Sequence, residues 1–112
     1  MSVIDVYSIM LTFVEDEKFT TAAVELLTAG QRDGLIEALA RHPMGGDVIP
    51  GYGGCRKLRL AARGKGAQGG VRVIFFPRLH LGQILLLALC PKSKKSSLTS
   101  QEIKLLKQKV KS

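Results

Sequence analysis

The chain has 112 residues, with 17 Lys and Arg against 9 Asp and Glu, and a formal net charge of +8. This length predicts a single domain over residues 1–112, and the hydrophobic content of 46% is enough for a mainly aliphatic core. These values exclude a multidomain enzyme, a collagen-like chain and a disulfide scaffold. The longest apolar run, Ile84 to Cys90, is far shorter than the ~20 residues that span a bilayer. The N-terminus lacks the basic start of a signal peptide, so we expect a cytoplasmic protein that does not bind membranes.

The positive charge is concentrated in the second half of the chain. Residues 1–54 hold 3 basic and 8 acidic residues, whereas residues 55–112 hold 14 basic residues and one acidic residue, Glu102. Clustered cations of this kind are typical of proteins that bind a polyanion such as RNA. A merely solubilising surface would mix both signs. The second half therefore favours a polyanion partner, with an acidic protein as the alternative.

The first half predicts one strand and two helices. The β-rich run Ile9 to Val14 is expected to form the strand, which acidic residues close. Apolar residues recur at helical spacing from Phe19 to Leu27, with Gly30 as the expected C-cap. A second helix is expected over residues 31–41 and should pack antiparallel to the first.

After a glycine-rich loop over residues 44–54, the hydrophobic period changes from helical to alternating. Three consecutive strands are predicted over 56–60, 71–76 and 83–89, joined by turns at 64–70 and 77–82. Because Ile84 to Leu89 is apolar at every position, this strand should be central and covered on both faces.

The last predicted element is an amphipathic helix. Thr99 and Glu102 fit a capping box at its start. Lys104, Lys107 and Lys111 lie on one face at helical spacing. The expected fold is therefore α+β: an N-terminal strand and helix pair, an antiparallel sheet of about four strands, and a C-terminal helix.

The sequence contains no convincing motif for a common cofactor, for acid–base catalysis or for nucleophilic catalysis. Residues 64–69 read GKGAQG, but a β-rich run follows where a dinucleotide site needs a helix. The two histidines have no ligand-type neighbours, so we predict no metal and no cofactor. Paired carboxylates and nucleophile motifs are not found either. If the protein is an enzyme, its chemistry would depend on Lys and Arg.

The first strand of the basic half alternates cations with leucines. Lys57 and Arg59 would share one face of this strand, with Leu58 and Leu60 on the other. Arg72 joins them only if the hairpin register places it on the same face, which the sequence leaves open. The alternative is an ordinary solvated face, although further lysines at positions 92, 94 and 95 follow the next strand.

Residues 46–106 resemble a known family. The loop and strand GDVIPGYGGCRKLR, the hairpin GKGAQGGVRVIFF, an apolar strand, a lysine-containing turn and a Leu-Thr helix start follow one another in the order of RelE/HigB-type toxins of type II toxin–antitoxin systems. The chain departs from the family pattern in two places. Phe75-Phe76 stands where Tyr-Tyr is common, and Cys90-Pro91-Lys92 replaces Tyr-Ala-Lys or Tyr-Gly-Lys. We expect Pro91 to redirect the chain and move Lys92, so that these departures would leave a weakened or an inactive toxin.

The resemblance implies a ribosome-dependent endoribonuclease that cleaves mRNA in the 30S A site and is neutralised by a cognate helix-turn-helix antitoxin. The ribose 2′-OH would attack the neighbouring phosphate without a metal, leaving a 2′,3′-cyclic phosphate and a 5′-OH. By position, Arg59 and Arg72 would stabilise the phosphate, and Lys57 or Lys92 would transfer a proton. The expected RNA contacts are Arg56, Arg63, Lys65, Lys94, Lys95, Lys104, Lys107 and Lys111.

Two other functions are compatible with the sequence. A ParE-like toxin of the same superfamily would poison DNA gyrase, although it would not need cations on the central strands. A non-catalytic RNA-binding module would bind single strands with a strong salt dependence but cleave nothing.

Overall fold

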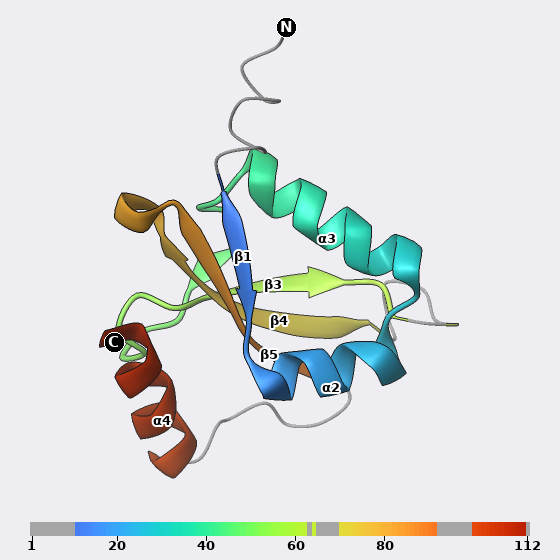
Figure 1. Cartoon of the computed structure of the whole chain (residues 1–112). Coiled ribbons are helices and arrows are strands. Elements are labelled where there is room, and N and C mark those ends of the chain that lie inside the picture. Colours follow the sequence, from blue (N-terminus) through green and yellow to red (C-terminus); the bar gives the residue numbers. More distant parts are fainter. Residues whose placement is uncertain (1–10, 63, 65–69, 92–99, 112) are drawn as a thin grey trace, which may run out of the picture.

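The computed structural model describes residues 11–62, 64, 70–91 and 100–111 (Figure 1). The elements, in chain order, are β1 (Thr12–Glu15), α2 (Glu17–Leu26), α3 (Ala29–Arg41), β2 (Asp47–Val48), β3 (Arg56–Leu60), β4 (Val71–Arg78), the short 3₁₀ helix η2 (Leu79–Leu81), β5 (Gln83–Pro91) and α4 (Ser100–Lys111). No helix in these ranges is long and apolar enough to cross a membrane.

The strands form one mixed five-stranded sheet in the order β1-β5-β4-β3-β2. The α+β class is confirmed, and so is the antiparallel run of β3, β4 and β5. The expectation of an antiparallel sheet of about four strands is wrong, because β1 pairs in parallel with β5 and β2 adds a fifth strand. The pairing of β1 joins segments some 70 residues apart in sequence, and β2 is too short to show a period-2 pattern.

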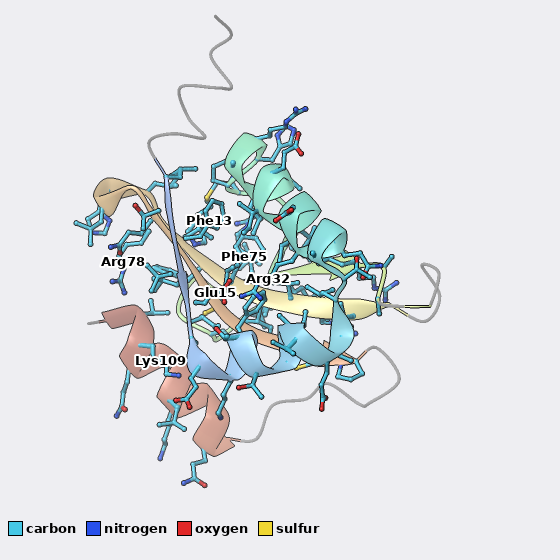
Figure 2. All side chains as sticks on the ribbon, turned by 45° about the vertical axis from the view of Figure 1, so that its right-hand side comes forward. Phe13, Glu15, Arg32, Phe75, Arg78 and Lys109 are labelled. Carbon is cyan, nitrogen blue, oxygen red and sulfur yellow. The ribbon has the colours of Figure 1, made fainter. Side chains whose placement is uncertain are left out.

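The junction between α2 and α3 lies earlier than expected. Gly30 is the second residue of α3 and not a C-cap. Thr28 begins α3 through a capping box: the Gln31 N–H donates to Thr28 Oγ1 at 3.0 Å, and the Thr28 N–H donates to Gln31 Oε1 at 2.9 Å. The two helices diverge from this junction in both views, so they do not lie side by side along their length (Figures 1 and 2).

The sheet has an apolar cluster on each face. On one face, β4 and β5 pack against α2 and α3, in a cluster that includes Phe19, Leu35, Leu39, Phe75 and Leu86. On the other face, a smaller cluster is built from Cys55, Ile74, Leu85 and Leu87, with Val110 of α4 packed against it. The prediction that the 83–89 strand is central and covered on both faces is therefore confirmed. Pro91 extends β5 in register with Val71, so it does not redirect the chain within the strand.

The end of α4 is attached to the sheet through polar contacts. Arg78 donates to the backbone carbonyls of Lys109 at 3.0 Å and of Val110 at 2.6 Å. Lys109 forms an ion pair with Asp16 at the start of α2, and Figure 2 shows it directed from α4 toward that segment. The predicted capping box at Thr99 and Glu102 lies outside the described residues. These contacts hold α4 on the second face, beside the cluster around Leu85.

Candidate functional site

Three cations converge on the sheet face that α2 and α3 leave uncovered. Arg59 of β3 lies directly opposite Arg72 of β4, and Lys57 lies two residues before Arg59 on the same face. Val71 and Val73 on either side of Arg72 belong to the core on the opposite face. The register therefore places Arg72 on the same sheet face as Lys57 and Arg59, which the sequence had left open.

These cations line a pocket of about 380 Å³, together with Asp47 and Leu58. Lys57 and Arg59 are exposed, and Arg72 is half-buried. The volume falls in the range of about 300–1,000 Å³ that is usual for small-ligand sites. Because guanidinium groups donate several hydrogen bonds in a planar fork, this pocket suits a phosphate group.

Asp47 enters the pocket from the edge strand β2, where it lies directly opposite Lys57. The sequence did not point to this residue, because it belongs to the acidic half of the chain and lies nine positions before the basic strand. The preceding Gly46 has φ +74°, and a Cβ atom there would lie 2.2 Å from the Lys57 carbonyl oxygen. Glycine at position 46 thus lets β2 approach β3 and brings Asp47 to the pocket. The two glycines before Asp47 were the feature of the sequence that could have indicated this close approach.

Arg56 does not join this group, although it was expected to contact RNA. It lies opposite Phe75, on the face of β3 that carries Leu58. Its guanidinium donates to the carbonyl oxygens of Gly45 and Gly46, both at 3.2 Å. Arg56 therefore holds the loop that precedes β2, and so supports the position of Asp47.

Lys104 and Lys107 of α4 are not among the described residues that line the pocket. Lys104 and Lys107 are exposed. The Cγ atom of Lys107 is 3.8 Å from the place of a Cβ atom on Gly53, in the loop between β2 and β3. Lys107 therefore borders the loop that leads into β3. Other predicted residues lie outside the described part of the chain: Arg63, Lys65, Lys92, Lys94, Lys95 and the side chain of Lys111.

A second pocket of about 430 Å³ lies between α4, β1 and β5. Both acidic and basic side chains line this pocket. Lys109 already pairs with Asp16, and Arg78 already donates hydrogen bonds to the end of α4. The basic pocket on β3 and β4 is thus the better candidate for an anionic ligand.

Cys55 directly precedes β3 and is fully buried in the cluster of the second face. Burial raises the pKa of its thiol to about 11, so the thiol stays protonated at neutral pH. Cys90 is half-buried and lies opposite Arg72 on β5. Among the described residues, no group of three or more His, Cys, Asp or Glu side chains is arranged to hold a metal ion.

No protein-family model matches the chain. Functional assignment therefore depends on the geometry and charge of the basic pocket.

Proposed function

We propose that this protein is a cytoplasmic toxin of RelE/HigB type that cleaves mRNA on the ribosome. The observation that carries the proposal is the convergence of Lys57, Arg59 and Arg72 in one pocket, on the sheet face away from α2 and α3. A half-buried arginine beside two exposed cations forms an anion site with no need for a metal. The RelE-like motifs seen in the sequence supply the remaining support.

The reaction would be a transesterification within the RNA. The ribose 2′-oxygen loses its proton to a base and forms a bond to the adjacent phosphorus. The bond from phosphorus to the 5′-oxygen breaks, and the leaving 5′-oxygen takes a proton from an acid. Negative charge grows on the nonbridging phosphate oxygens in the transition state. Fixed guanidinium groups on Arg59 and Arg72 would stabilise that charge, and removal of one such donor typically costs about 10²–10³ in rate.

The surroundings of the pocket fit a large ribonucleoprotein partner. The exposed Lys104 and Lys107 would carry further positive charge on α4, separate from the pocket, and would contact ribosomal RNA at the 30S A site. A cognate helix-turn-helix antitoxin would neutralise the toxin when bound.

RNA 5′-end mapping after brief induction in a bacterium without the antitoxin tests this function. Wild type would be compared with Arg72→Ala and with Arg41→Ala, a control on the last turn of α3 where the arginine pairs with Glu37. We expect new 5′-OH ends confined to translated messages, lost in Arg72→Ala and retained in Arg41→Ala. Circular dichroism of each purified variant would show that it is folded.

The alternatives give different results in the same cells. Intact messages together with DNA breaks would assign gyrase poisoning and overturn the proposal. Intact messages without DNA damage, with salt-dependent binding of single-stranded RNA, would assign a non-catalytic RNA-binding module. Cuts that persist in folded Arg72→Ala would overturn the placement of the site.

A further inference from the structure

A carboxylate inside a pocket lined by three cations needs an explanation. Asp47 weakens the attraction of the basic pocket for any phosphate, since like charges repel. Its position is nevertheless held by a glycine at positive φ and by the Arg56 hydrogen bonds to the preceding loop. A site that only bound RNA would be improved by a neutral residue at this position.

From this placement we infer that Asp47 is a catalytic residue of the proposed nuclease, the general base that removes the proton from the ribose 2′-OH. The inference rests on the proposed function. Lys57, which faces Asp47 directly across β2 and β3, is then the general acid. Side chains at such directly opposed positions have Cβ atoms about 5 Å apart, close enough to act on the two oxygens of one phosphodiester.

In this step, the Asp47 carboxylate accepts the proton of the 2′-OH as the bond from the 2′-oxygen to phosphorus forms. The bond from phosphorus to the 5′-oxygen breaks, and the leaving oxygen takes a proton from the Lys57 ammonium. Arg59 and Arg72 balance the charge on the nonbridging oxygens. The products are a 2′,3′-cyclic phosphate, a 5′-OH, a neutral Asp47 carboxyl and a neutral Lys57 amine, and exchange with water restores both groups.

The chemistry favours this division of roles over a lysine base. An ammonium group has no lone pair and must lose its proton before it can accept one, whereas a carboxylate is ready to accept one at neutral pH. Among the described residues, the charged groups that line the pocket with Asp47 are Lys57 and Arg59 from β3 and Arg72 from β4. All three are cations. Asp47 would therefore accept the proton, and the cations would stabilise the negative charge on the phosphate.

The first test compares wild type, Asp47→Asn and a matched control, Asp33→Asn, an exposed aspartate on α3. Single-turnover cleavage would be measured on ribosomes programmed with a synthetic mRNA, across a range of pH. We expect Asp47→Asn to lose about 10²–10⁴ in rate and to lose the acidic limb of the pH profile. Its affinity for single-stranded RNA should stay equal or rise, because a negative charge has left the pocket.

A second substrate separates the base from the acid. When sulfur replaces the bridging 5′-oxygen, the leaving group no longer needs a proton. This substrate should restore cleavage by Lys57→Ala but not by Asp47→Asn. Rescue of Asp47→Asn instead would assign Asp47 to the leaving group and overturn the inference.

The remaining outcomes are also decisive. An unchanged or faster rate in Asp47→Asn, or a loss of RNA affinity that matches the loss of rate, would overturn the role of Asp47 while wild-type cleavage upholds the proposed function. Failure of wild type to cleave on programmed ribosomes would instead overturn the proposed function itself.

Discussion

Arg59 and Arg72 face each other directly across the antiparallel strands β3 and β4. Like charges at directly opposed positions destabilise a sheet, by an amount similar to the roughly 0.2–1 kcal/mol that a favourable pair contributes. The pair of Arg59 and Arg72 thus lowers the free energy of unfolding, and it lies on the sheet face that carries the pocket. Destabilising arrangements of this kind are concentrated at functional sites.

Neutral substitutions of Arg56 and Arg59, which lie on opposite faces of β3, should change the free energy of unfolding in opposite directions. We expect Arg59→Gln to raise the free energy of unfolding by up to about 1 kcal/mol, because it removes the repulsion from Arg72. Arg56→Gln should lower it by about 1–3 kcal/mol, because the carbonyls of Gly45 and Gly46 lose their charged donor. Urea denaturation of both variants would measure the difference. A loss of stability in Arg59→Gln would show that its repulsion from Arg72 is screened.

The local features of the fold could be predicted from the sequence. Alternating cations and leucines identified β3, and the wholly apolar run 84–89 identified a strand covered on both faces. The shared face of Lys57 and Arg59 followed from the period of two. Each of these features depends on neighbouring residues, which a sequence shows directly.

Features that depend on distant partners could not be predicted. The parallel pairing of β1 with β5 is set by tertiary packing, and the two residues of β2 carry no periodic signal. Asp47 belongs to the pocket only because the chain turns back at a glycine-rich loop. Arg56 was grouped with the RNA contacts by its charge alone, whereas its strand face directs it to the loop carbonyls.

The approach of β2 to β3 should depend on Gly46. In Gly46→Ala, the new Cβ atom would meet the Lys57 carbonyl oxygen, and the residue would also be strained at positive φ. We expect a loss of stability well above the roughly 1–2 kcal/mol of positive φ alone, with a loss of RNA cleavage.

Gly51→Ala is the matched control for this substitution. Gly51 also has positive φ, +81°, but nothing lies within 4 Å of its Cβ position. Gly51→Ala should lose only the roughly 1–2 kcal/mol of stability that positive φ costs. Equal thermal denaturation midpoints for the two variants would contradict the role assigned to close approach at Gly46.

Acid should loosen the contacts that β1 and the start of α2 make with α3 and α4. A hydrogen bond from Arg32 holds the pKa of the Glu15 carboxyl below its usual value. Burial favours the protonated form of Asp16, but hydrogen bonds from Lys109 and from the Lys18 N–H outweigh it, so the pKa of Asp16 is also lowered. Both groups therefore stabilise the fold above their unfolded pKa values of about 4, and this stability is lost as the pH falls through the lower folded values.

Hydrogen exchange and urea denaturation at pH 7 and at acidic pH would measure this effect. We expect the protection factors of the α4 amide protons, which correct for the slower intrinsic exchange in acid, to fall as the pH falls. The double variant Glu15→Gln with Asp16→Asn should be less stable at pH 7 and show a smaller further loss in acid. Asparagine is an equally good helix N-cap, so the variant removes the charge without removing the cap of α2. An unchanged pH dependence in the variant would contradict these two carboxylates as its source.

The two cysteines should differ sharply in reactivity. With a pKa of about 11 and no exposed surface, Cys55 should react with iodoacetamide at pH 8 on the order of 100-fold more slowly than an ordinary thiol. Cys90 is half-buried and should react first.

Because Cys90 lies opposite Arg72, its alkylation should crowd the pocket and weaken RNA binding severalfold. Mass spectrometry of the alkylated sites, followed by RNA binding of wild type and Cys90→Ser after the same treatment, would check both expectations. Equal labelling of the two thiols would contradict the burial of Cys55. Unchanged RNA binding after labelling of Cys90 would contradict the placement of Cys90 beside the pocket.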